Sequence, residues 1–244
     1  PLLTNPSRCD TYQLSATATP YGGGADKTFS DDYTVDQCDT VQFDPQITNN
    51  ITSDSGGQAP SDPIPASSAQ GIIADITFPA ATNQPEANSS FSSVKMVMPR
   101  GFGANYSAFG NPSDMCPGAS LGKVGDRYTF SPGSCPGSAK VGEAYIYTPL
   151  MPTGSALTGY VYLINNTPLP AIAIAVTEDI AGNLPGVDIY MVGTAALEYA
   201  DSAGLTGDES RVTMKFTGLP DTPVSMIQVN LEMGSRTRLS GPPL

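Results

Sequence analysis

The stretch "AIAIAVTEDIAGNLPGVDIYMV", residues 171–192, decides the fold class, because two short apolar runs flank a turn-rich connection. The runs Ala171–Val176 and Val187–Val192 have the length of strands and are too short for typical helices. Gly, Asn and Pro within Glu178–Gly186 are typical of a hairpin connection. The stretch therefore predicts two neighbouring antiparallel strands.

Short apolar or alternating runs of the same kind recur along the rest of the chain. No stretch combines the 3.6-residue period with the caps that a helix needs, so we expect helix in under about 15% of residues. The 244 residues include 25 Gly and 23 Pro and only 14% are charged, which favours strands joined by turns. We predict an all-β, antiparallel, Ig-like β-sandwich. The other expected strands are Tyr12–Ala18, Thr40–Phe43, Gly71–Phe78, Val94–Met98, Ala144–Thr148, Gly159–Ile164, Ala196–Tyr199, Val212–Phe216 and Met226–Leu231.

A polar stretch suggests how the chain is divided. Residues 49–70 are rich in Ser, Asp, Gly, Pro and Ala, so we expect a surface loop or linker there. Residues 1–48 would then form a small disulfide-bridged β segment, and residues 71–244 a larger β-sandwich. Because a segment this short rarely holds a core alone, we expect it to pack against the larger block or against a preceding copy of the chain.

Charge and composition restrict the partners. The formal net charge is -12 with only 11 Lys and Arg, which would repel a nucleic-acid backbone, so we expect no nucleic-acid partner. No apolar run approaches the roughly 20 residues that cross a bilayer, so we expect no membrane insertion. Few Lys, abundant Ser, Thr and Asn, and four Cys favour a secreted or cell-surface protein.

The four cysteines predict disulfides, not a metal site. The chain has no His, and its Cys spacings are far longer than the roughly two to four residues of zinc motifs, so we expect no metal and no cofactor. We predict that Cys9 pairs with Cys38 and Cys116 with Cys135, with the two other connectivities as alternatives. Cys116 and Cys135 each begin a Cys-Pro-Gly phrase that is followed by Lys-Val-Gly, so we expect a turn at each bridge and then a strand.

Catalytic patterns in the sequence lack their partners. Ser120 lies in a Gly-x-Ser-x-Gly pattern, but a chain without His has no base for that nucleophile, so we interpret residues 118–122 as a turn. A pair of carboxylates for glycoside hydrolysis stays an alternative, although sugar-binding enzymes usually present Trp platforms and this chain has no Trp. We therefore expect a non-enzymatic protein.

Four tyrosines form the candidate ligand-binding site. Tyr145 and Tyr147 are two residues apart on one expected strand, and Tyr160 and Tyr162 are two residues apart on the next. Each pair points to one face of its strand, so the four rings could form a patch that binds glycan. The alternative is that they pack across the strands within or beside the core.

Several phrases resemble a repeated β-rich domain of very long exported cell-surface proteins of actinobacterial type. The resemblance spans most of the chain and is specific in order and spacing. It implies an exported structural or adhesive role and supplies no active site. The matching phrases are Leu2–Cys9, Cys38–Pro45, Val97–Gly101, Cys135–Glu143, Tyr147–Met151 and Gly159–Leu163.

The two ends of the chain suggest an array. The chain ends Ser-Gly-Pro-Pro-Leu and begins Pro-Leu-Leu without Met, so we expect one unit of a series in which each module contacts its neighbours. The sequence thus favours a structural module of a cell-surface stalk or head-to-tail filament. A glycan- or host-binding adhesin module is the alternative.

Overall fold

The protein is all-β. The structure is a computed structural model in which the described residues form antiparallel strands and short 3-10 turns, with no α-helix among them. This confirms the predicted fold class. The structure describes residues 5–53, 70–78, 90–98, 111–124, 127–148, 156–167, 169–178, 187–199, 210–217, 219, 221 and 224–231.

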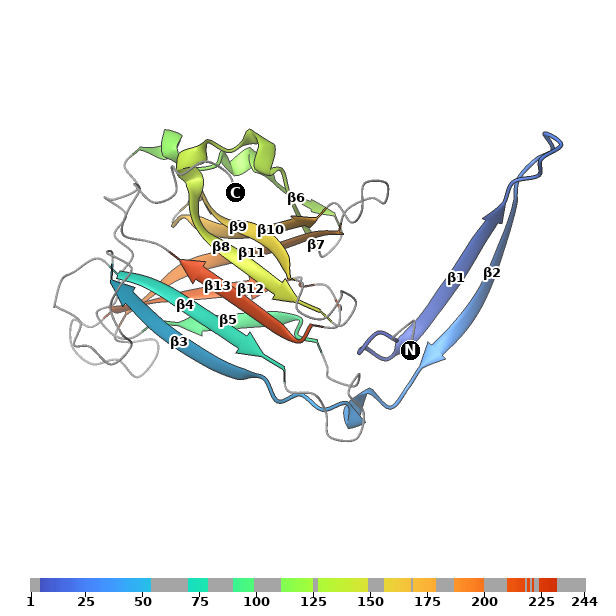
Figure 1. Ribbon diagram of the computed structural model, residues 1–244, viewed down its shortest axis with the longest axis horizontal. Coiled ribbons are helices and arrows are strands. Elements are labelled where there is room, and N and C mark those ends of the chain that lie inside the picture. The colour runs from blue at the N-terminus through green and yellow to red at the C-terminus, as the bar shows by residue number, and fades with distance from the viewer. Residues whose placement is uncertain are drawn as a thin grey trace.

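A nine-stranded antiparallel sheet forms the body of the molecule. It is one continuous sheet that curls, so that β3, β4 and β13 lie over β5 and β12 (Figure 1). The two layers therefore belong to one sheet, whereas the predicted sandwich would have two separate sheets. In spatial order the strands are β3 (Gln46–Ser53), β4 (Gln70–Thr77), β13 (Met226–Leu231), β8 (Lys140–Tyr147), β9 (Leu157–Ile164), β10 (Ala171–Glu178), β11 (Val187–Tyr199), β12 (Ser210–Thr217) and β5 (Ser93–Val97).

The predicted central hairpin is β10–β11, with Glu178 opposite Val187 at its turn end. Strand β11 also contains Ala196–Tyr199, which the sequence suggested as a separate strand. The polar interruption between the two runs is Gly193, and a Cβ at this position would lie 2.6 Å from the Phe216 ring. A side chain is therefore absent there because the neighbouring aromatic ring occupies its space, and the strand continues through the glycine.

The inner face of the curled sheet holds the main core. Alternating apolar residues from its strands meet there and exclude water. The core residues are Val141, Ala144, Ile146, Leu157, Val161, Leu163, Ile172, Ile174, Val176, Ile189, Met191, Met214, Phe216, Ile227 and Leu231.

A disulfide-stapled segment covers the outer face of β9–β11. It contains the hairpin β6–β7 and is closed by the Cys116–Cys135 bridge, as predicted. Cys116 is fully buried and donates its N–H to Leu163 O, while Asn165 N–H donates to Cys116 O, both at 2.9 Å. After each Cys-Pro comes a 3-10 turn and then a strand that includes Lys-Val, which confirms the expected order. The elements are η3 (Pro112–Asp114), η4 (Gly118–Ser120), β6 (Leu121–Val124), β7 (Arg127–Phe130), η5 (Pro132–Ser134) and η6 (Gly137–Ala139).

The N-terminal segment is a hairpin of β1 (Asp10–Ala18) and β2 (Lys27–Val35) that projects away from the body (Figure 1). The predicted Cys9–Cys38 disulfide joins its two ends. At the tip, Gly23 has φ 73°, a conformation that glycine adopts readily.

Two expectations for the residues that follow the hairpin differ from the structure. The expected strand at Thr40–Phe43 is not formed: Thr40 ends the 3-10 turn η1 (Cys38–Thr40), and residues 41–43 belong to no strand. Residues 49–53, expected in a loop or linker, belong to β3, which pairs with β4 through Ile47 and Ile76 among others. Polar residues fit this strand because it is an edge strand and part of it faces solvent. Residues 54–69 of the expected connection lie outside the described residues.

Truncating a core valine tests the inner face of the sheet. Val176 is fully buried and Val124 on β6 is 71% exposed, so the same substitution meets two environments. We expect Val176→Ala to lower the free energy of unfolding by about 2 kcal/mol, from lost transfer energy and a residual cavity. Val124→Ala should change it by less than about 0.5 kcal/mol. Urea unfolding of the oxidised proteins measures both, and equal effects would contradict this description of the core.

Candidate functional site

The projecting hairpin has one apolar and one polar face. Directly opposed residues of an antiparallel pair lie on the same face, so the register assigns the side chains. One face carries Tyr12, Leu14, Ala16 and Ala18 from β1, opposite Tyr33, Asp31, Phe29 and Lys27 from β2. The other carries Thr11, Gln13, Ser15 and Thr17, opposite Thr34, Asp32, Ser30 and Thr28.

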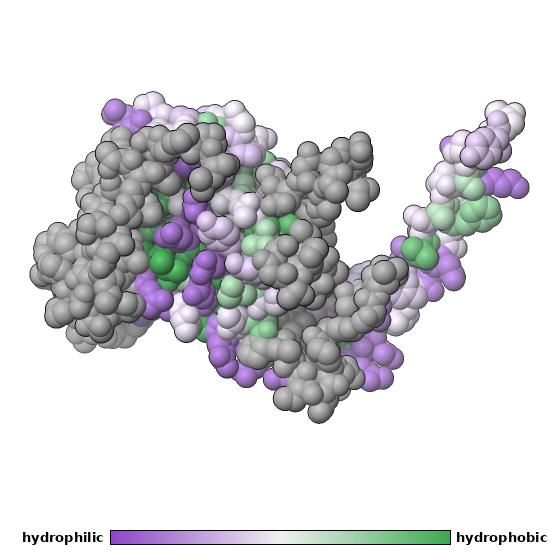
Figure 2. Space-filling model, viewed as in Figure 1, coloured by the Kyte–Doolittle hydropathy of each residue, from purple (hydrophilic) through white to green (hydrophobic). Residues whose placement is uncertain are grey.

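The apolar face of the hairpin is uncovered. Leu14 is 69% exposed, Phe29 58% and Tyr33 43%, and Figure 2 shows hydrophobic residues at the surface of the hairpin. Within this face the rings of Tyr12 and Tyr33 stack, with centroids 5.7 Å apart. An exposed apolar patch on a soluble protein usually marks a surface that contacts another molecule.

The polar face is held by hydrogen bonds across the two strands. Gln13 Nε2 donates to Asp32 Oδ1 at 3.0 Å, and the hydroxyl oxygens of Thr17 and Thr28 are 3.2 Å apart. These side chains are satisfied within the hairpin and exposed to solvent. Covering the apolar face would therefore remove apolar surface from water, whereas the polar side chains already have partners within the hairpin.

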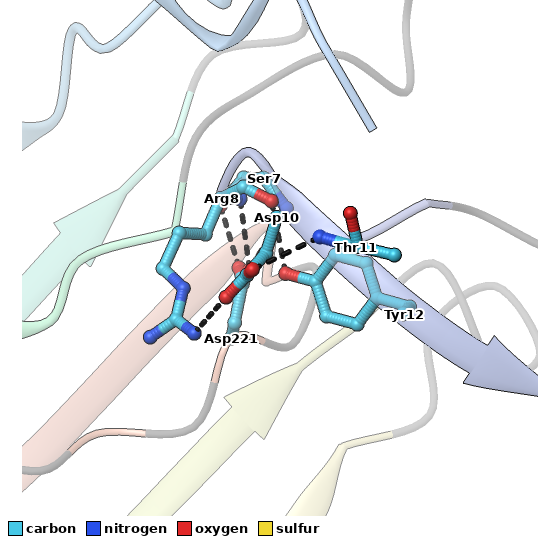
Figure 3. Close-up of polar contacts among 6 residues, drawn as sticks. All are labelled: Ser7, Arg8, Asp10, Thr11, Tyr12 and Asp221. Atoms are coloured by element: carbon cyan, nitrogen blue, oxygen red, sulfur yellow. Dashed lines mark hydrogen bonds and ion pairs between the residues drawn. The ribbon is translucent and has the colours of Figure 1, made fainter. Parts of the chain in front are cut away.

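The base of the hairpin is fixed to the body through Asp221. The carboxylate accepts the N–H of Ser7 at 2.8 Å, the N–H of Arg8 at 3.2 Å and the hydroxyl of Ser7 at 2.5 Å (Figure 3). Ser7 Oγ also accepts the N–H of Ser90 at 3.3 Å. The Arg8 guanidinium lies 2.6 Å from Asp10 and lowers the pKa of that carboxyl through a hydrogen bond. These contacts set the direction in which the hairpin leaves the body.

An apolar groove opens between the two edge strands of the curled sheet. Its volume is about 370 Å³, and its lining comes from both ends of the strand order, β3 and β5, as well as from the core below. Ile47 of β3 is 59% exposed at one rim, and Met96 of β5 is half-buried at the other. Among the lining residues that the structure describes there is no carboxylate, so this groove does not present the facing acids of a glycoside hydrolase.

Among the strands that the structure describes, the rims of the groove are the two edges of the sheet. Strands β3 and β5 each pair with one neighbour, β4 and β12, in the described part of the chain. An edge strand presents unpaired backbone N–H and C=O groups that can pair with a further strand. The groove thus combines apolar side chains with hydrogen-bonding edges on both sides.

Basic side chains lie beside the β5 rim. Lys95 Nζ is 3.2 Å from Glu198, and Arg211 is 2.8 Å from the same carboxylate, which lowers the pKa of Glu198 mainly through the Arg211 hydrogen bond. Lys215 is directly opposite Lys95 and is exposed. Since the whole chain has only 11 Lys and Arg, three of them together on β5 and β12 form a local basic site in an acidic protein.

The four predicted tyrosines share the outer face of β8 and β9. Tyr162 is buried with its ring 5.3 Å from Phe130, under the stapled segment. The Lys140 ammonium lies 3.7 Å from the ring centroid of Tyr160. Tyr145 and Tyr147 are half-buried, and Tyr147 O accepts the N–H of Ser225 at 2.9 Å. The rings of Tyr162 and Tyr160 therefore contact protein groups in this structure, so the four tyrosines do not form four open platforms.

Tyr145 has the most perturbed environment of the four. Its hydroxyl donates to Glu143 Oε2 at 2.7 Å, and this hydrogen bond, with smaller contributions from burial and charge, raises the pKa of Tyr145 to about 12. The phenol is therefore neutral at physiological pH and acts as a hydrogen-bond donor.

Other candidate chemistry is absent from the described residues. Ser120 lies in the 3-10 turn η4 and donates its hydroxyl to Pro117 O at 2.6 Å, which confirms the interpretation as a turn. No group of three or more His, Cys, Asp or Glu in the described chain is arranged to hold a metal ion. None of the described segments forms a helix of the length and apolar character needed to span a bilayer.

Comparisons with known proteins give no match to a family model, a curated protein or a solved structure.

Sequence reasoning missed the hairpin and the groove as a site. Strand β2 was not predicted because Asp31 and Asp32 interrupt its apolar pattern. A signal was present, since Phe29 and Tyr33 keep the two-residue phase on either side of Asp31. The groove depends on where a curled sheet stops, which no local pattern encodes.

Removing the Glu143 charge should change the titration of Tyr145. A raised pKa stabilises the protonated phenol in the fold; this contribution is complete below the ordinary value of 10.0 and is lost as the pH rises through about 12. We expect Glu143→Gln to move the Tyr145 titration down toward 10.0, as followed by NMR of tyrosine ring carbons. Tyr145→Phe assigns the signal, and an unchanged titration would contradict the hydrogen bond.

The Asp221 contact gives a second prediction. We expect Asp221→Ala to increase amide hydrogen exchange at Ser7 and Arg8 several-fold, because both N–H groups lose a charged acceptor. Asp36→Ala, an exposed acid after β2, is the control and should leave these amides unchanged. Equal exchange in both variants would show that Asp221 does not fix the hairpin.

Proposed function

We propose that the chain is a non-enzymatic extracellular structural module that assembles head to tail in a cell-surface stalk or filament. The observation that carries this proposal is the disulfide-closed hairpin β1–β2, which projects from the body with its apolar face uncovered. An isolated two-stranded hairpin is marginally stable in water, so a hairpin with this apolar face gains most from contact with another chain.

Two further features support an extracellular role. Both pairs of cysteines form disulfides, which persist in oxidising environments outside the cytosol. The net charge of -12 suits a protein that stays dispersed until specific contacts form. The resemblance to repeated domains of exported surface proteins points in the same direction.

The adhesin alternative has less support from the tyrosines. Carbohydrates stack on exposed aromatic faces, whereas the Tyr162 ring is buried against Phe130 and the Tyr160 ring lies under the Lys140 ammonium. Glycan binding through this patch would require both rings to be uncovered. We therefore place the functional surface on the hairpin instead of the tyrosine face.

Self-association of the purified chain tests the proposal. We expect the average mass in sedimentation equilibrium to rise past that of a dimer between about 1 µM and 1 mM, the range in which interfaces of modest size form. Electron microscopy of the concentrated sample should show linear particles. The Val124→Ala protein, altered at an exposed residue of β6, serves as the control and should associate equally. A chain that stays monomeric throughout would contradict non-covalent head-to-tail assembly.

A further inference from the structure

We propose that the hairpin β1–β2 of one copy docks, apolar face inward, on the groove between β3 and β5 of the next copy. The proposal rests on the proposed head-to-tail assembly and names its two surfaces. The occupant of the groove is thus a second copy of this chain.

The two surfaces match in the chemistry of their side chains. The hairpin offers Leu14 and Phe29, which are mostly exposed, and Tyr33, which is 43% exposed, and the groove offers half-buried apolar side chains such as Met96 and Val229. A fully buried aromatic side chain covers about 150–250 Å² and about half of each of these side chains is still exposed, so the three contribute on the order of 300 Å². A stable interface buries roughly 800 Å² per partner, and backbone pairing at the rim adds to the area.

The two surfaces also match in their backbones. Each hairpin strand has one edge without a partner, and so do β3 and β5 at the rims of the groove, among the strands that the structure describes. Strand addition at a free edge satisfies the N–H and C=O groups of both chains while alternate side chains fill the pockets below. The hairpin alternates apolar and polar residues, as this mode of binding requires.

Charge favours the β5 rim as the point of contact. Lys215 lies exposed on β12 opposite Lys95, which is paired with Glu198, whereas Asp32 is exposed on the polar face of the hairpin strand β2. With the apolar face inward, Asp32 stays on the outer face of the hairpin, and placing β2 beside β5 brings its carboxylate near the exposed Lys215 ammonium of the other copy. In a chain of net charge -12, this local pairing offsets part of the general repulsion and gives the contact a direction.

The geometry of the base excludes the chain's own groove as the target. Asp221 accepts three hydrogen bonds from Ser7 and Arg8, and these contacts hold the hairpin pointing away from the body (Figures 1 and 3). The hairpin and the groove are different surfaces of one chain, so their contact is heterologous and leaves a free hairpin and a free groove at the ends. Contacts of this kind can extend into a linear chain of copies.

Paired variants on the hairpin test the first surface. The double variant Leu14→Thr with Phe29→Thr removes the apolar face while keeping residues that favour strands. Its control, Ser15→Thr with Ser30→Thr, introduces two threonines at the neighbouring positions, which lie on the polar face. We expect the first variant to weaken self-association at least tenfold in sedimentation equilibrium, and the control to associate like the original chain. Equal association of the two variants would overturn the proposal.

A variant at the groove tests the second surface. Ile47→Asp places a charge at the exposed rim, where it should not disturb the core, and Gln46→Asp is the control on the other face of β3. We expect Ile47→Asp alone to abolish chain growth. Mixed with the hairpin variant, it should form a one-to-one complex that stops there, because one partner supplies the hairpin and the other the groove. No complex in the mixture would overturn the proposal.

The remaining outcomes separate this proposal from the proposed function. Growth beyond a dimer that ignores both variants supports head-to-tail assembly but overturns the hairpin contact. A closed dimer that the hairpin variant and Ile47→Asp both disrupt supports the contact between hairpin and groove and contradicts the filament. Binding of a long-chain fatty acid to the original chain, blocked by Ile47→Asp while the chain stays monomeric, would assign the groove to a small apolar ligand and overturn both.

Discussion

The curled sheet stops before its two edge strands meet, and the rest of the structure depends on this. Curling lets the inner face bury apolar side chains from β4, β13 and β8 through β12 in one core. A closed barrel has no edges, but a sheet ending at β3 and β5 retains two, with a strip of half-buried side chains between them. The groove is therefore the direct result of the number of strands and their order.

The two disulfides stabilise the parts that the main core cannot. The segment from Cys116 to Cys135 consists of 3-10 turns and a short hairpin, and a small cluster that includes Cys116 and Phe130 packs it on the outer face of the sheet. The N-terminal hairpin has still less to bury. Closing a loop of about 15–30 residues contributes roughly 3–4 kcal/mol in the entropic account, which offsets part of the cost of ordering strands without a core. A hairpin held in this way can remain ordered although its apolar face is exposed.

Local patterns in the sequence account for much of this fold. The strands around Ala171–Val192 were predicted because their side chains are buried on both faces, inward in the core and outward under the stapled segment, so the runs are almost wholly apolar. Cysteine spacing and the lack of His predicted both disulfides. Strand β3 was missed because an edge strand facing solvent has a polar composition that resembles a loop.

The functional surfaces were predictable only in part. The small size of the N-terminal segment indicated that it needs a partner, and this expectation rests on the general cost of order in a short chain. The two surfaces themselves depend on long-range features: the register that puts Leu14 and Phe29 on one face, and the point at which β3 and β5 end the sheet. The tyrosine pairs show the opposite case, since their spacing places them on one face without revealing that Phe130 covers Tyr162.

Opposing electrostatic effects would make assembly of this kind orderly. Each copy carries a net charge of -12, so two copies repel each other. At physiological salt this repulsion is largely screened beyond about 8 Å. Within that distance Lys215, beside the ion pair of Lys95 and Glu198, would attract a carboxylate to the β5 rim of the groove. Repulsion then disfavours unspecific contacts between apolar faces, while the local attraction selects the orientation in which strand addition and burial occur together. A chain with an exposed apolar hairpin and an open groove needs such selection, because the same two features without it would lead to disordered aggregation.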